Sequence, residues 1–436
     1  MDVLDRARGA LLGMAVGEAL GAPLEGLEPE MIEEKIGKIT GYLDARKTQP
    51  EHRSGFFVHA VYEDETQAAL AMSETLVRKG GFDVDALKTR LEELGQTIDG
   101  NTFGCYRRPR RNFRTAVRRM LSGAAWEECG VNTAGSGAAS RGIPIGVFYR
   151  DDRDQRLRAS VESSLLTHRD PRAGAATASV AEAVAIVCAL ESPGDAKPAA
   201  IAKEIAAAAR DAEELMAEKY ETVLYPGYEP YLHQYSGAAA ELQSLVALDI
   251  EPAFQKIIGW ASDKGSRPIT HATRGFSLTA VTSALYLFLT GLESFEDCVL
   301  DTICEGGNTD TLGCLVGGLC GALHGVDGIP AAWRETLKGA DQVLGWGDAL
   351  SGEADRGALP SLIAQEARLT PPAPPPPRKK RPVPQPRHGP GRDGPSGGRG
   401  RDGGRGGHGG GRGGGGGRPG GGRGRDDRRD DRRGGG

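Results

Sequence analysis

The composition of the chain changes abruptly at Pro371, and this change limits how much of it can fold. The 66 residues from Pro371 to Gly436 are mainly Pro, Gly, Arg and Asp, and they include no Phe, Tyr or Trp. Such a segment cannot bury enough apolar surface to offset the conformational entropy that folding removes. We therefore expect a disordered tail over 371–436, beginning with the polyproline spacer Pro371–Pro377. Residues 1–370 are then one folded domain, long enough for a sizeable core.

The formal net charge of -5 conceals opposite charges in these two parts. The tail contains 17 Lys and Arg against 6 Asp, whereas residues 1–370 contain 37 basic and 53 acidic residues. An acidic body repels polyanions, which argues against a compact nucleic-acid-binding domain. Arg-Gly units in the tail, such as Gly398-Arg399-Gly400-Arg401, resemble RGG segments of RNA-binding proteins. Without aromatic rings, any nucleic-acid binding there should be weak, independent of sequence and sensitive to salt. A solvated extension with no partner is the alternative.

The cysteines and the N-terminus indicate a cytoplasmic protein. Seven cysteines form no CxxC pair, and their odd number does not suit a disulfide framework. We interpret them as reduced, buried small residues. There is no signal-peptide pattern, and no long charge-free apolar stretch that would span a membrane. No membrane association is expected.

Helical periodicity dominates the first 370 residues. In Arg6–Leu20, apolar residues recur at helical spacing while Gly9, Gly13 and Gly17 stand four apart. Small residues at i and i+4 let another helix approach closely, so this helix should be central and buried. Further helices are expected over Thr66–Val77, Ala173–Leu190, Pro198–Tyr220, Ser277–Leu289, Phe295–Cys304 and Thr311–Leu323. Alternating strand patterns are scarce, so the sequence predicts an all-α bundle.

A basic segment interrupts this acidic body at Arg107–Arg119, which contains seven arginines. It fits either an exposed phosphate-binding patch or, more simply, a solvated helix face.

Two oxygen-rich turns each precede an apolar helix. The first places Glu63, Asp64 and Glu65 directly before the run Ala68–Leu76. Carboxylates are favoured at a helix N-terminus by the helix dipole, and capping by Asp64 or Thr66 is the purely structural alternative.

The second turn, Glu305–Thr311, offers oxygen ligands from Asn308, Asp310 and Thr311. Hard cations such as Mg²⁺ prefer oxygen ligands. Zinc is the weaker hypothesis because neither flanking cysteine has a His or second Cys at ligand spacing. Taken alone, this turn also fits an ordinary glycine turn with an Asp or Thr cap. Together the two turns favour a shared metal site.

Several segments, taken in order, resemble the ADP-ribosylglycohydrolase superfamily. The stretch Arg8–Gly26 is similar to the family's opening helix and acidic loop, and Glu63-Asp64-Glu65-Thr66 stands where the family has Thr/Ser-Asp-Asp-Thr. Further matches are Gly135–Gly146 with the family's Gly-Asn-Gly loop, Thr167-His168 with its Thr-His motif, and Gly306–Thr311 with its Gly-Gly-Asp-Thr-Asp-Thr, followed by Ile329-Pro330 and Trp333. The resemblance covers roughly Arg6–Lys338.

The chain departs from the family pattern at four positions. Glu63 replaces a hydroxyl ligand, while Glu18, Glu65 and Asn308 each replace an Asp. Oxygen ligands remain throughout, and the carboxylate lost at Asn308 is regained at Glu63. Because Glu is one methylene longer than Asp, the number and geometry of bound metals could change.

The resemblance implies a compact orthogonal helical bundle and a hydrolase that cleaves an N- or O-glycosidic bond to ADP-ribose, with a protein, a nucleic acid or a small molecule as the acceptor. It also implies one or two Mg²⁺ ions, with Mn²⁺ as the alternative ion, that hold the ribose hydroxyls and a water near the anomeric carbon. The expected metal ligands are Glu63, Asp64, Glu65, Asn308, Asp310 and Thr311.

The remaining site residues follow from the same resemblance. Glu25 corresponds to the family's mobile acidic-loop glutamate and is the expected general acid or base, with a surface carboxylate as the alternative. Gly135, Ser136 and Gly137 would present N–H groups to a diphosphate, unless they form an ordinary turn. His168 would lie against the ligand or serve as a structural histidine. The altered ligands leave two other classes open: a pseudoenzyme that binds ADP-ribose with little turnover, and a structural, crystallin-like protein. The retained Asp64, Asp310 and Thr311 argue against the structural class.

Overall fold

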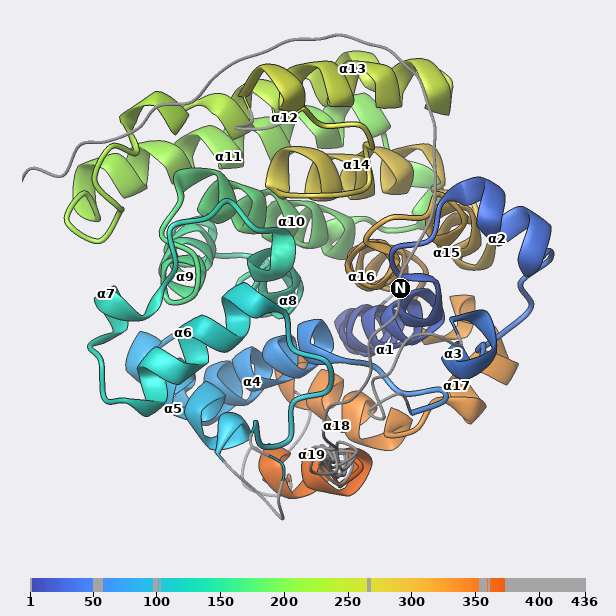
Figure 1. Ribbon diagram of the computed structural model, residues 1–436, viewed down its shortest axis with the longest axis horizontal. Coiled ribbons are helices and arrows are strands. Elements are labelled where there is room, and N and C mark those ends of the chain that lie inside the picture. Colours follow the sequence, from blue (N-terminus) through green and yellow to red (C-terminus); the bar gives the residue numbers. More distant parts are fainter. Residues whose placement is uncertain are drawn as a thin grey trace, which may run out of the picture. The chain divides into compact units, whose positions relative to one another are not determined.

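The structure, a computed structural model, describes residues 2–49, 58–96, 101, 103–264, 268–352, 359 and 361–372 (Figure 1). The expected tail over 371–436 lies outside the described residues except for Pro371 and Pro372, so the division at residue 370 stays a prediction.

Throughout the described ranges the regular elements are helices, and a parallel bridge joins Val131 to His168. The predicted all-α class is confirmed. In chain order the elements are α1 (Val3–Gly21), η1 (Ala22–Leu24), α2 (Pro29–Lys35), α3 (Ala45–Thr48), α4 (Asp64–Lys79), α5 (Val84–Gly95), α6 (Arg111–Leu121), α7 (Trp126–Cys129), η2 (Ser136–Arg141), α8 (Gly142–Phe148), α9 (Arg153–Leu165), α10 (Pro171–Ala189), η3 (Pro193–Asp195), α11 (Pro198–Lys219), η4 (Glu229–Tyr231), α12 (Gln234–Leu245), α13 (Ile250–Lys264), α14 (Ser277–Thr290), α15 (Phe295–Cys304), α16 (Thr309–His324), η5 (Val326–Gly328), α17 (Ala331–Thr336), α18 (Ala340–Ser351) and α19 (Leu362–Leu369).

The two glycine-rich helices α1 and α16 form the centre of the fold, where Figure 1 shows them side by side. Gly9, Gly13 and Gly17 of α1 face a matching stripe on α16, made of Gly321, Gly317 and Gly313. A Cβ on any of the three α1 glycines would fall closer than 3.0 Å to a backbone oxygen of α16, so the two backbones touch directly. The pairing order shows that the helices are antiparallel. The predicted close helix–helix approach is confirmed, and α1 is buried along almost its whole length.

This antiparallel contact brings the end of α1 to the beginning of α16. The Thr309 hydroxyl donates to the carbonyl oxygen of Gly21 over 2.8 Å, although the two residues are 288 positions apart. Residues that follow α1 therefore meet the oxygen-rich turn that precedes α16.

A buried glutamate of α1 fixes the start of α4. The Glu18 carboxylate accepts hydrogen bonds from the backbone N–H of Glu65 at 3.1 Å and of Thr66 at 3.0 Å. The structural alternative, in which Asp64 or Thr66 caps this helix, is wrong. Glu63 occupies the N-cap position, and its side chain makes no hydrogen bond to the helix. Glu18 of α1 thus accepts hydrogen bonds from N–H groups in the first turn of α4. The acidic side chains beside this turn are therefore available for other contacts.

Among the described residues, α10 is long and apolar enough by length and composition to cross a membrane, and a second span would arise only if the bent pair Val3–Leu24 and Pro29–Lys35 counted as one. However, 89% of the α10 stretch is buried inside the protein, where α10 packs against α8, α9 and α11. It is explained as a core helix.

Candidate active site

Three helix ends converge at the candidate site: the C-terminal end of α1 and the N-terminal ends of α4 and α16. Two N-termini add partial positive charge, which favours carboxylates and other anions there. Six carboxylates gather at this point, all buried or largely buried: Glu18, Glu25, Glu63, Asp64, Glu65 and Asp310.

A pair of backbone hydrogen bonds places Glu25 beside Asp310. The Gly26 N–H donates to the Gly307 carbonyl at 2.8 Å, and the Gly307 N–H donates to the Leu27 carbonyl at 3.0 Å. Gly26 and Gly307 have φ of +80° and +77°, a conformation that glycine adopts at little cost. The loop after α1 is thus held on the turn before α16.

The innermost carboxylates have unsatisfied oxygens. Glu18, Asp64 and Glu65 each offer an oxygen, and these three oxygens lie within 4.8 Å of one another. One Glu65 oxygen accepts a hydrogen bond of 2.8 Å from the Thr311 hydroxyl. The other, Oε2, and Asp64 Oδ1 are buried and have no hydrogen-bond partner among the described residues. Buried oxygens without partners are costly, and they are what a bound cation satisfies.

Burial and mutual repulsion raise the pKa of several of these carboxyls. Burial is the main cause for Glu18 and Asp64, whose pKa values lie well above the ordinary range, with Glu65 adding to both. Burial likewise raises the pKa of Glu63 to about 8, although the guanidinium of Arg108 opposes it. Because like charges this close disfavour joint ionisation, the cluster needs cations to remain fully charged.

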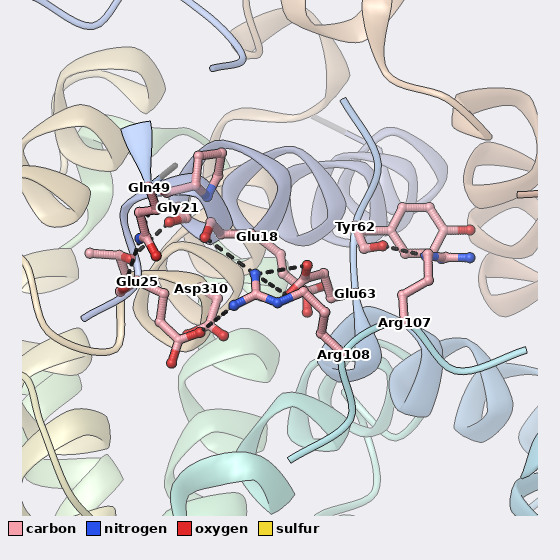
Figure 2. A network of polar contacts seen from close by, with 12 residues as sticks. Glu18, Gly21, Glu25, Gln49, Tyr62, Glu63, Arg107, Arg108 and Asp310 are labelled. Carbon is pink, nitrogen blue, oxygen red and sulfur yellow. Dashed lines mark hydrogen bonds and ion pairs between the residues drawn. The ribbon is translucent and has the colours of Figure 1, made fainter. Parts of the chain in front are cut away.

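Two arginines supply positive charge to the cluster. Arg108 contacts Glu25 at 2.9 Å and Glu63 at 3.1 Å, and Figure 2 shows its guanidinium between these carboxylates. Arg110 pairs with both Glu25 and Asp310, and its backbone N–H donates to Asp64 over 3.3 Å. Arg108 has a φ of +48°, an uncommon conformation for a residue with a side chain, and such strain is frequent at functional sites.

The segment Arg107–Arg119 was expected to be an exposed phosphate-binding patch or a solvated helix face, and both interpretations are wrong for its first part. Arg107 is buried in an ion pair of 2.8 Å with Glu366, and Arg108 and Arg110 enter the carboxylate cluster. Arg111 and Arg118 on α6 are exposed, as a solvated helix face predicts. The feature of the sequence that could have indicated these buried arginines is the large number of acidic residues in the predicted site, because buried carboxylates require counterions.

A cleft of about 190 Å³ opens beside the cluster. Its lining includes Asp64, Glu65, Arg110, Asn112, Asn308 and Thr311, and also Gly135, Ser136, Gly137 and His168. A Cβ on Gly135 would fall 2.7 Å from Nε2 of His168, so glycine is required where the loop lies on this ring. Nδ1 of His168 is 2.8 Å from the Thr167 hydroxyl. Burial and the neighbouring Arg141 lower the pKa of His168 to about 3, which keeps the ring neutral.

The structure brings the sequence-predicted residues to one place. Asp64, Glu65, Asn308 and Thr311 line the cleft together with the predicted substrate loop, and Glu25, Glu63 and Asp310 join the same ion-pair network. Asn308 is half-buried at the N-cap of α16. The sequence-based site omitted Glu18, Arg108, Arg110 and Asn112. The sequence did indicate a buried position for Glu18, because it lies within a helix whose small residues predict a close contact with another helix.

The ADP-ribosylglycohydrolase family model matches residues 1–360. The chain belongs to this family. It is 25% identical to the ADP-ribosyl-dinitrogen reductase glycohydrolase of Rhodospirillum rubrum, over 77% of the chain and 91% of that relative. It is also 25% identical to the ADP-ribosylhydrolase ARH3 of Danio rerio, over 78% of the chain and 88% of that relative. A solved structure named as an ADP-ribosylglycohydrolase-related protein complex shares the fold with a TM-score of 0.53 and 22% identity, covering 81% of the chain and 99% of its own.

Membership in the ADP-ribosylglycohydrolase family makes the chain a hydrolase of glycosyl bonds to ADP-ribose. The convergent helix ends supply what such a site needs: a buried acidic cluster with free oxygens that could hold a metal ion, beside a cleft lined by a glycine loop. An oxygen-only donor set without sulfur or imidazole suits a hard divalent cation.

Proposed function

We propose that this chain is a magnesium-dependent hydrolase that removes ADP-ribose from a modified acceptor, with Mn²⁺ as a possible substitute ion. The observation that carries the proposal is the pair of buried, unpartnered oxygens in the acidic cluster, Asp64 Oδ1 and Glu65 Oε2. Asp64, Glu65, Asp310 and Thr311 would hold the ion. When bound, such an ion supplies Lewis-acid charge that orients the substrate and acidifies water.

Two other predicted ligands are less well placed for this role. The Glu63 carboxylate is engaged by Arg108, and Asn308 is only half-buried where it lines the cleft. Glu63 therefore serves first as a counterion in this arrangement.

Glu25 is the proposed general acid or base. Its side chain is 14% exposed, so it can exchange protons with water, and it lies beside Asp310 at the site. Burial is the main cause that raises its pKa, and Asp310 adds to this, while Arg110 and Arg108 oppose it. A carboxylate with a raised pKa is a better proton acceptor near neutral pH, which suits the activation of a water for attack at an anomeric carbon.

The remaining predicted residues would bind the substrate. Ser136 and Gly137 open the short helix η2, where first-turn N–H groups lack intrahelical partners and can donate to a diphosphate. A Cβ on Gly137 would meet nothing within 4 Å, so the backbone is accessible from the open side. The neutral His168 ring supports Gly135 and can contact a ligand without adding charge.

The test is a panel of ADP-ribosylated substrates, linked through arginine, serine, a nucleic-acid end or a small molecule, each assayed with Mg²⁺, with EDTA and with no addition. We expect release of ADP-ribose from at least one substrate with Mg²⁺ and none with EDTA. An ADP-ribose binding titration run in parallel distinguishes an enzyme from a protein that binds without turnover. Binding with no release from any substrate would contradict the proposal.

A further inference from the structure

Arg110 places a positive charge on Asp310, one of the proposed metal ligands. Its guanidinium contacts Glu25 in the loop after α1 and Asp310 in the first turn of α16, and its backbone N–H donates to Asp64. One positively charged side chain thus bridges the acidic loop after α1 and the start of α16.

The two arginines of the cluster differ in how firmly they are held. The Arg108 side chain is 11% exposed, and it also contacts the carbonyl oxygen of Ala22 at 3.4 Å behind the carboxylates. The Arg110 side chain is 40% exposed and lines the open cleft. Arg110 can therefore withdraw toward solvent without unpacking the core, whereas Arg108 cannot.

A divalent ion held at the proposed ligands and the Arg110 guanidinium would share one carboxylate, that of Asp310. Asp310 is 1% exposed, and its Oδ2 is taken by Arg110, while its Oδ1 accepts a hydrogen bond of 2.8 Å from the Thr311 N–H. An ion ligated by Asp310 would lie within a few ångströms of the guanidinium. Two positive groups at about 4 Å repel strongly in a partly buried site.

We propose that Arg110 is a displaceable internal cation that competes with the divalent ion for Asp310, and so sets the affinity of the site for metal. The inference rests on the proposed metal dependence and adds a positioning residue to it. Without an ion, Arg110 stabilises the carboxylates and partly fills the cleft. When an ion binds, Arg110 leaves, and the cleft, smaller than the ~300–1,000 Å³ typical of ligand pockets, becomes wider.

The test is a calorimetric titration of the full chain with Mn²⁺ and with Mg²⁺, in the absence of substrate. Arg110→Gln should lower the metal dissociation constant at least about tenfold, because a competing charge is removed. Arg110→Lys keeps a charge but cannot bridge two carboxylates, so its metal dissociation constant should lie between those of the wild type and of Arg110→Gln. Arg111→Gln is the matched control: it removes an exposed charge one residue away that has no carboxylate partner in the described ranges, and it should change the constant less than twofold.

The outcomes separate this inference from the proposed function. If neither the wild type nor any variant binds an ion, the proposed metal dependence fails. If the wild type binds an ion and folded Arg110→Gln binds it equally or more weakly, the competition is refuted. Should Arg110→Gln fail to fold, Arg110→Lys decides: a dissociation constant below the wild-type value supports the competition, and one at or above it overturns the competition.

Discussion

Replacement of Gly17 by alanine tests the helix pair on which the site is built. In an exposed helix, Gly→Ala usually stabilises a protein by about 0.5–1 kcal/mol because glycine loses more backbone entropy on folding. At Gly17 the new Cβ would overlap the carbonyl oxygen of Gly313, with backbone on both sides and no flexible side chain to yield. The helices would have to separate by roughly 1 Å, and such overpacking typically costs about 1–3 kcal/mol or more. We expect Gly17→Ala to destabilise the protein by about 2 kcal/mol after the entropy gain is subtracted.

The matched control is Gly259→Ala in α13, where a Cβ would meet nothing within 4 Å. This variant should stabilise by about 0.5–1 kcal/mol, so the two substitutions have opposite signs. Urea unfolding followed by circular dichroism measures both. Gly17→Ala should also lose activity, because Glu18 and Asp310 flank the contact and a shift of about 1 Å disturbs catalytic geometry. If Gly17→Ala were as stable as Gly259→Ala, the direct backbone contact between α1 and α16 would be disproved.

Three further predictions concern proton transfer, pH and the tail. Glu25→Gln should lower turnover about 10²–10⁴-fold while ADP-ribose still binds, as measured by kinetics beside a binding titration; loss of binding alone would make Glu25 a ligand rather than a proton carrier. Burial raises the pKa of Glu213, a buried residue of α11, to about 7, above its ordinary value of ~4.3, so the stability it contributes is complete at low pH and is lost as pH rises through 7. Unfolding at pH 5 and pH 8 should show a smaller decline for Glu213→Gln than for the wild type, and an unchanged decline would exclude Glu213 as the cause. A chain truncated after Thr370 should keep its hydrolysis rate and lose RNA binding at low salt, measured by filter binding across a salt series; equal RNA binding by both chains would move that site to the exposed arginines of α6.

Seven of the helices, and the close helix–helix contact of α1, could be predicted from local pattern. Gly9, Gly13 and Gly17 at a spacing of four required a close partner, and the spacing is a property of the sequence alone. The identity of the partner, the stripe on α16 some 300 residues later, depends on tertiary packing. The convergence of both acidic turns at one cleft follows from that antiparallel pairing and not from any local signal.

The arginines show where prediction from the local sequence pattern fails. Arg107, Arg108 and Arg110 belong to a dense basic segment, which in an acidic protein usually lies in solvent. Their inward direction depends on the carboxylates that the loop after α1, the start of α4, the start of α16 and helix α19 place nearby, and periodicity carries no information about those neighbours. Glu18 was noted as a departure from the family pattern but left out of the predicted site for a related reason, because its partners are backbone N–H groups of a helix that begins 46 residues later.

The decisive measurement is the rate of ADP-ribose release by wild type and by Asp310→Ala, each with Mg²⁺ and with excess EDTA. Asp310 is buried where the end of α1 meets the start of α16, and its carboxylate is proposed to hold an essential ion. We expect that only wild type with Mg²⁺ is active, that Mg²⁺ restores the EDTA-treated wild type, and that Asp310→Ala keeps its helical circular dichroism. Full activity of Asp310→Ala, or of wild type in EDTA, would contradict a metal-dependent hydrolase at this site.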